Sequence, residues 1–325
     1  MASTTNRLPL RLIETFRSVF YTPIYVSVAG GFLEAQGLDV DFKTCPSEFA
    51  HPLSCLNRGG ADIAQSGIMR SIISSDWGAE TVPMHFAKIN SRDGFFILGR
   101  TGPDAVPNAV PNAKGEAAFD WDLLRGAKLI PVGFSPMPWA SLQFAMRRHG
   151  VEPSELDLVT GLDLDGAMAA FRAGEAEYIH VPQPAAEQLL DDGSGHLAVA
   201  LGLENGHLAY SSFAATHHFL ESQPEIVQRF TVGFANALDW LAAHDAPEVG
   251  EAVAGFFPQV NPELIVKSVA RLKAQDNWPT DPTLAQPEYE NLHDILVAAG
   301  LANERQPYTK VVRTDIVETA LASRR

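Results

Sequence analysis

The sequence contains little cysteine. Its 325 residues include two, Cys45 and Cys55, and their spacing supports neither a disulfide framework nor a structural zinc site. No run of 18 apolar residues occurs, so the sequence predicts no transmembrane helix. The first 12 residues also lack the apolar segment and cleavage site of a secretory signal. As encoded, the chain is therefore expected in the cytoplasm, or in the periplasm if a leader was removed.

Basic residues are in the minority. Lys and Arg total 24 against 39 Asp and Glu, which gives a formal net charge of -15. A surface this acidic repels phosphate backbones, so binding to nucleic acid or to an anionic membrane surface is disfavoured. Hydrophobic residues make up 46% of the chain, which is enough to build a core and excludes general disorder. At about 150 residues per domain, the length predicts two domains.

Expected strands alternate with expected helices along most of the chain. This order predicts an α/β fold with a mainly parallel sheet covered by helices. We expect strands at 10–15, 38–43, 62–65, 82–89, 94–99, 129–132, 156–159, 178–181, 196–201 and 209–215. A C-terminal helical region follows, with helices expected at 223–243, 248–256, 262–275 and 288–299.

Residues 101–118 interrupt the alternation. They are rich in Pro and Gly and contain the tetrapeptide Ala-Val-Pro-Asn twice, at 105–108 and 109–112, which indicates an exposed connecting loop. We expect one lobe at 1–102 and 209–325 and a second at 103–208. Crossings near Gly99–Gly102 and His207–Ser211 would form a hinge. Because α/β sheets bind ligands beyond the carboxyl ends of their strands, a ligand is expected between the lobes.

One segment carries a family resemblance. Residues 23–40, PIYVSVAGGFLEAQGLDV, resemble the opening of solute receptors with the type II periplasmic-binding-protein fold, most of all those for sulfonates, nitrate, taurine and thiamine-precursor pyrimidines. Weaker similarities follow in the expected order at 59–67, 122–130, 167–176 and 219–230. The resemblance implies two lobes that close on a small polar or anionic solute, such as a sulfonate, a carboxylate or a pyrimidine. It also implies an ABC permease as a possible partner. We expect no cofactor and no metal.

Aromatic residues after the first strand are candidate ligand contacts. The resemblance implies that the loop holding Phe20 and Tyr21 faces the cleft, where their rings would contact a planar or apolar group. Phe20 has the alternative of packing in the core. Tyr210 and Ser211, at the return crossing, are also candidates, and hinge packing is their alternative.

The junction after the third strand is the leading candidate for anion binding. Gly67 lets a ligand approach the backbone next to Ser66, and free N–H groups at a helix start attract anions. Arg70 lies one turn further and would place a guanidinium on a carboxylate or sulfonate. Alternatively, Arg70 is a solvated helix residue paired with Asp76 or Asp93.

The second lobe has two similar junctions. Ser135 is expected to cap a helix with Pro136 at its first position, and the helix terminus would bind an anion. Trp139 would form a wall of the cleft. Gln183, which follows a strand, offers both a donor and an acceptor to a ligand.

An enzyme on the same scaffold is the alternative function. It would be a decarboxylase, desulfinase or hydrolase acting on a small organic acid. Aromatic sulfinate desulfinases of this fold use a Cys in the loop after the first strand, and Arg17–Tyr21 contains none. Thiamine-pyrimidine synthases carry a Lys and a His where this chain has Ser66 and Arg70. We therefore predict a binding protein, either the substrate-binding protein of an ABC transporter or a cytoplasmic sensor, and assign no catalytic residue.

Overall fold

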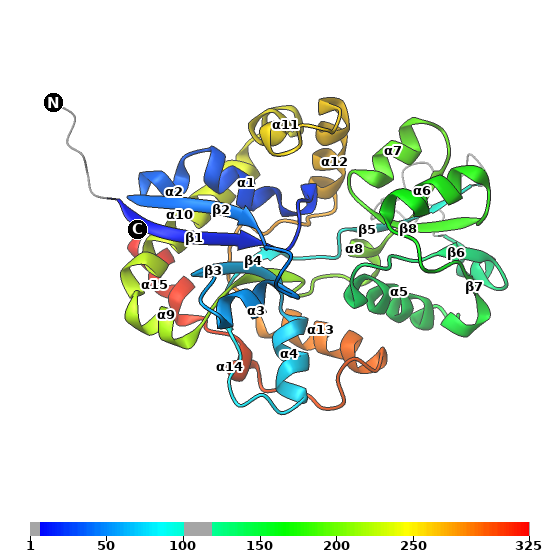
Figure 1. Ribbon diagram of the computed structural model, residues 1–325. Coiled ribbons are helices and arrows are strands. Elements are labelled where there is room, and N and C mark those ends of the chain that lie inside the picture. Colours follow the sequence, from blue (N-terminus) through cyan, green and yellow to red (C-terminus); the bar gives the residue numbers. More distant parts are fainter. Residues whose placement is uncertain (1–6, 101–118, 325) are drawn as a thin grey trace.

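Two mixed sheets covered by helices form two lobes in the computed structural model, which describes residues 7–100 and 119–324 (Figure 1). The expected α/β class, the two lobes and the helical C-terminal region are confirmed. The Ala-Val-Pro-Asn pair at 105–112 and the loop expected around it lie outside the described residues.

The sheet of the first lobe has the strand order β2-β1-β3-β10-β4. Strand β1 (Leu8–Glu14) is parallel to β2 (Leu38–Thr44) and to β3 (Ile63–Gly67). Strand β10 (Ser211–Ala215) runs antiparallel between β3 and β4 (Met84–Asn90). The chain therefore returns to the first sheet after building the second lobe.

The sheet of the second lobe has the order β7-β6-β8-β5-β9. Its parallel strands are β7 (Asp157–Leu158), β6 (Lys128–Ile130) and β8 (Tyr178–Pro182). Strand β5 (Phe95–Gly99) is antiparallel to β8 and to β9 (His196–Ala200).

Strand β5 corrects the expected lobe boundary. The sequence prediction placed residues 94–99 in the first lobe, but all five residues of β5 pair with β8 in the second sheet. The first crossing between the lobes is therefore Ser91–Gly94, between β4 and β5, rather than Gly99–Gly102. The second crossing joins β9 to β10 and includes the expected segment His207–Ser211.

Helices cover both faces of the first sheet (Figure 1). The helix expected at 23–35 is divided into α1 (Thr22–Ala29) and α2 (Phe32–Ala35), because Gly31 adopts a left-handed φ of 71°. On the same face lie α10 (Pro224–Ala243), α11 (Ala246–Val253), α12 (Pro262–Ala274) and α15 (Asp315–Ser323). The other face carries α3 (Pro52–Asn57), α4 (Met69–Asp76), α13 (Gln286–Ala298) and α14 (Tyr308–Val311).

The apolar stripe of α10 packs on the first sheet, as its helical spacing predicted. Phe230 and Phe234 each lie 4.8 Å, centroid to centroid, from the ring of Phe213 on β10, edge to face. All three side chains are fully buried. This aromatic cluster fixes β10, and therefore the end of the second crossing, to the first lobe.

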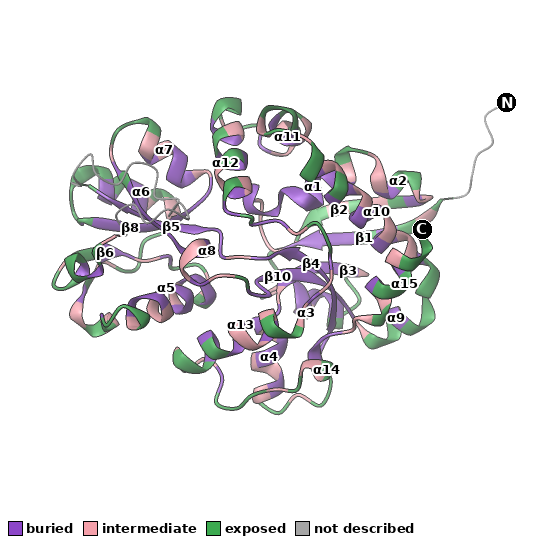
Figure 2. Ribbon diagram, turned by 180° about the vertical axis from the view of Figure 1, so that it is seen from behind, coloured by how far each residue is buried: buried purple, intermediate pink, exposed green. Residues whose placement is uncertain are grey.

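The second lobe is covered by α5 (Pro136–Arg148), α6 (Leu164–Ala173), α7 (Ala185–Asp191) and the short α8 (Leu201–Glu204). Figure 2 shows that buried residues line both sheets and the inward faces of their helices. Among the described residues, no helix is both long enough and apolar enough to span a membrane.

Candidate functional site

A small cavity lies where the two lobes meet. Its volume is about 80 Å³, well below the roughly 300 Å³ at which pockets for drug-sized ligands begin. The first lobe contributes Thr15, Phe16, Tyr21, Gly67, Met69, Arg70, Tyr210 and Ser211. The second contributes Phe95, Phe134, Ser135, Met137 and Pro138. The lining therefore comes from segments that follow or begin strands in both sheets.

Arg70 lines this cavity with an unpaired charge. No carboxylate of the described residues lies within ion-pair distance of its guanidinium, and burial lowers the pKa of Arg70. Asp76 instead accepts hydrogen bonds from Asn303, and Asp93 accepts one from the Phe95 amide. A cation that is partly desolvated and lacks an internal partner favours an anion supplied from solution.

The start of α4 adds to this positive potential. The first amides of a helix have no acceptor within the helix, and its dipole places partial positive charge there. Gly67, Met69 and Arg70, at the junction of β3 with α4, all line the cavity. No Asp or Glu appears in the described lining. The cavity is thus locally positive in a chain with a net charge of -15.

Tyr210 lines the cavity and has a buried hydroxyl. Its oxygen has no hydrogen-bond partner within residues 7–100 and 119–324. Burial, with a smaller effect of nearby Asp93, raises the pKa of Tyr210 well above its ordinary value. The hydroxyl therefore stays protonated at neutral pH.

Gln65 organises the first-lobe side of the site without lining it. Its amide oxygen accepts from the Thr15 backbone at 2.8 Å, and its amide nitrogen donates to Ser211 Oγ at 2.8 Å. These two bonds join β1, β3 and β10 at the cavity. Sequence reasoning missed Gln65 because its partners are 50 and 146 residues away.

Aromatic rings close the cavity from both lobes. Phe16 of the first lobe meets Phe134 of the second edge to face, with ring centroids 5.3 Å apart. Phe95 lies 6.1 Å from Phe134, and Tyr21 lies 5.5 Å from Phe16. Sequence reasoning found Tyr21 among these rings, but did not single out Phe16, Phe95 or Phe134, although all three lie at strand ends or junctions.

Ser135 is at the N-cap of α5, as predicted, and lines the cavity. Its side chain makes no capping hydrogen bond, so the hydroxyl can serve a ligand. The expected anion site at this terminus is weaker than at α4, because Pro136 and Pro138 have no N–H group.

Four predicted contacts do not line the cavity: Phe20, Ser66, Trp139 and Gln183. Phe20 is buried and packs edge to face on Tyr210, with ring centroids 5.4 Å apart. It therefore takes the core position that was the alternative to ligand contact. Ser66 is fully buried, because successive side chains of a strand point to opposite faces and Gly67 takes the cavity side. Trp139 is half-buried and packs against the core instead.

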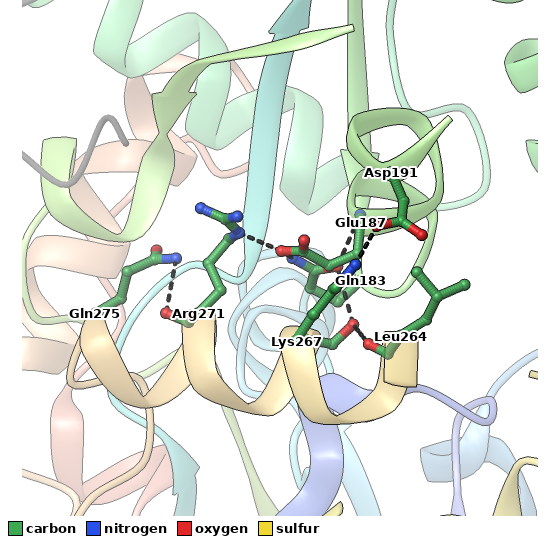
Figure 3. Close-up of polar contacts among 8 residues, drawn as sticks. Gln183, Glu187, Asp191, Leu264, Lys267, Arg271 and Gln275 are labelled. Carbon is green, nitrogen blue, oxygen red and sulfur yellow. Dashed lines mark hydrogen bonds and ion pairs between the residues drawn. The ribbon is translucent and has the colours of Figure 1, made fainter. Parts of the chain in front are cut away.

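Gln183 is covered by α12. Its amide oxygen lies 3.2 Å from Ser268 Oγ, and its amide nitrogen donates to Glu187 at 3.2 Å (Figure 3). A helix that comes 80 residues later therefore occupies the space that the prediction gave to a ligand.

A second, outer groove of about 360 Å³ adjoins the cavity and shares Met69 and Arg70 with it. His51 and Trp77 line this groove, and Trp77 is 78% exposed. His51 caps α3, because its Nδ1 accepts from the Ser54 amide. Arg70 therefore lies between the inner cavity and the outer groove.

Neither cysteine reaches the cavity. Cys55 is buried and Cys45 is half-buried, and burial raises the pKa of both thiols. The described lining also contains no His, Asp or Glu. In the part of the chain that the structure describes, no group of three or more His, Cys, Asp or Glu residues is placed to hold a metal ion.

A curated relative matches most of the chain. The "Putative binding protein YtlA" of Bacillus subtilis (strain 168) is 29% identical over 310 residues, covering 95% of this chain and 89% of that protein. No protein-family model matches the chain.

Solved structures share the fold at low identity. The alkanesulfonate-binding protein SsuA of Xanthomonas axonopodis pv. citri, bound to MOPS, has a TM-score of 0.67 at 17% identity and covers 95% of this chain and 99% of its own. The C27S mutant of the desulfurization enzyme DszB, in complex with biphenyl-2-sulfinic acid, has a TM-score of 0.71 at 15% identity and covers 98% and 99%. The predicted resemblance is thus confirmed: the chain has the two-lobed fold of the type II periplasmic-binding-protein family.

Proposed function

We propose that this protein binds a small organic anion, a sulfonate or a carboxylate, between its two lobes and releases it chemically unchanged. The observation that carries the proposal is Arg70, an unpaired and partly desolvated cation that lines a cavity built by both lobes. The anionic group would contact the Arg70 guanidinium and the first amides of α4. A bidentate contact between a guanidinium and a carboxylate or sulfonate is both strong and directional.

The aromatic lining defines the rest of the solute. Tyr21, Phe95 and Phe134 offer ring faces and edges to a planar or short apolar group. Because the cavity holds only about 80 Å³, a larger solute needs the lobes to separate or its distal part to extend past Arg70 into the outer groove. A neutral pyrimidine would leave the charge of Arg70 without a partner, so anions are favoured over it.

Binding is favoured over catalysis by the chemistry of the lining. The likeness to DszB, a desulfurization enzyme, is a reason to consider catalysis as the alternative function. The described lining, however, offers hydroxyl groups and one guanidinium, with no thiol, imidazole or carboxylate to act as a nucleophile or general base. An import role would add an ABC permease as partner, and a permease and an ATPase encoded beside this gene would support it.

A thermal-shift panel tests the proposal. Benzoate, benzenesulfonate and methanesulfonate are compared with benzamide, the uncharged analogue of benzoate. A ligand present at 100 times its Kd stabilises the folded state by about 2.7 kcal/mol. We expect stabilisation by at least one anion and none by benzamide, with the anion recovered intact by mass spectrometry. Equal shifts for benzoate and benzamide, or consumption of the anion by the protein alone, would contradict the proposal.

A further inference from the structure

One polar contact between the lobes, away from the cavity, joins α7 of the second lobe to α12 of the first (Figure 3). Glu187 on α7 forms an ion pair with Arg271 on α12. The Glu187 side chain is 5% exposed and that of Arg271 is 18% exposed. This pair is therefore largely removed from solvent.

A hydrogen-bond network holds Glu187 in place. Gln183 donates to its carboxylate at 3.2 Å and accepts from its backbone amide at 3.3 Å. Ser268, one turn before Arg271 on α12, donates to the Leu264 carbonyl at 2.6 Å, and its hydroxyl oxygen also lies 3.2 Å from the same Gln183 amide oxygen. Two residues from each lobe thus form one buried polar unit, which we name the latch: Gln183, Glu187, Ser268 and Arg271.

The latch lies outside the cavity. None of its four residues lines the cavity. Helix α12, however, also contacts the short helix η1 (Val19–Tyr21), which ends at the cavity residue Tyr21. The latch therefore fixes the distance between the second lobe and the part of the first lobe that holds Tyr21.

The lobes are closed around a cavity of about 80 Å³. A solute that is larger than this and does not extend into the outer groove needs the lobes to move apart. Any motion that separates α7 from α12 breaks the latch. When it breaks, both charged groups regain water, which offsets much of the lost attraction. The latch can thus stabilise the closed arrangement and still open.

We propose that the latch sets the closed state of the lobes, and through it the affinity and release rate of the solute, with Glu187 and Arg271 as positioning residues that never touch the ligand. This inference rests on the proposed function for its ligand-binding part only. The ligand-free shape of the protein tests it independently.

The same two helices supply a matched control. Lys267 and Asp191 also form an ion pair between α12 and α7, but their side chains are 46% and 48% exposed (Figure 3). Exposed pairs contribute little, so loss of this pair is expected to leave the closed state intact. If removal of the buried pair opens the lobes and removal of the exposed pair does not, the difference reflects burial and the hydrogen bonds of the latch.

The first experiment uses the full chain without ligand. Small-angle X-ray scattering is measured for the wild type, Glu187→Gln, Arg271→Met and Lys267→Met, after circular dichroism has shown that each is folded. The radius of gyration expected for a closed chain of this length is roughly 20 Å. Both latch variants should give a larger value than the wild type, and Lys267→Met should not. Equal values for all four proteins would overturn the latch.

The second experiment measures dissociation of benzenesulfonate, or of benzoate if it binds more tightly, by stopped flow. Both latch variants should weaken binding about 5- to 150-fold, the usual range of coupling between separate sites, mainly through faster release. A larger radius with unchanged release would overturn the claim that the latch sets affinity. If the wild type binds neither anion, the proposed function fails, while the scattering result still decides whether the latch closes the lobes.

Discussion

Replacing Arg70 with Met should weaken binding and stabilise the ligand-free protein at the same time. The substitution keeps an unbranched side chain and removes a guanidinium that has no ion-pair partner among the described residues. Hydrogen bonds to charged groups contribute about 1.5–3 kcal/mol, so the affinity for benzoate should fall about 10- to 150-fold. Benzamide, the neutral analogue, should stabilise neither the wild type nor the variant.

The gain in stability follows from desolvation. A fully buried, unpaired charge costs several kcal/mol, and because Arg70 remains partly exposed we expect a gain of about 1 kcal/mol in the free energy of unfolding. For a chain of this size that is a rise in Tm of about 1–2 °C. Calorimetric titration gives the affinity, and differential scanning calorimetry gives the Tm.

Arg17 is the control for this substitution. It is also in the first lobe, but its guanidinium pairs at 2.9 Å with Glu14, whose side chain is fully buried. Arg17→Met leaves that carboxylate without its cation, so it should lower the Tm. If Arg70→Met lowers the Tm as Arg17→Met does and leaves benzoate affinity unchanged, Arg70 is a structural residue and the assignment of the site is wrong.

Three further predictions concern the hinge, the cavity mouth and the core. Burial raises the pKa of Asp93 to about 7 from an ordinary value near 3.8, so the folded state retains a proton that the unfolded state has lost, and stability falls as pH rises from about 4 through 7. In urea titrations, the free energy of unfolding of Asp93→Asn relative to the wild type should therefore be about 2–3 kcal/mol more favourable at pH 8 than at pH 5; a difference that does not vary with pH would contradict this. Phe134→Ala removes an interlobe ring contact from a side chain that is 48% exposed, so stopped flow should show faster association and release with less than about 1.5 kcal/mol of lost stability, and unchanged rates would exclude Phe134 from the mouth. Phe230→Ala should cost about 3–5 kcal/mol in the same urea titrations, and a loss below 1 kcal/mol would show that the cluster on β10 does not anchor the first lobe.

The expected elements were found because their signals are local. The apolar stripe of α10, the Pro at the start of α5 and the alternation in β2 each depend on residues within a few positions of one another. Assignment of strands to sheets is not local. The strand Phe95–Gly99 is a short apolar run, and nothing within it indicates that its hydrogen-bond partner begins at Tyr178.

Sequence reasoning brought several candidate contacts to the cavity where a strand meets a helix. Arg70, Ser135 and Tyr210 line the cavity, and their contact with a ligand stays a prediction. Ser66 does not line the cavity, because one step of strand alternation reverses the face of a side chain. Gln183 does not line it either, because α12 covers Gln183, and that contact joins residues 85 positions apart.

A crystal structure of the protein with its best-stabilising anion from the panel shows where the solute binds. We expect the anionic group between the lobes, within hydrogen-bond distance of the Arg70 guanidinium and the first amides of α4, with the rings of Tyr21 and Phe95 against the rest of the solute. An anion bound at high occupancy elsewhere on the surface, with the cavity between the lobes unchanged, would contradict it.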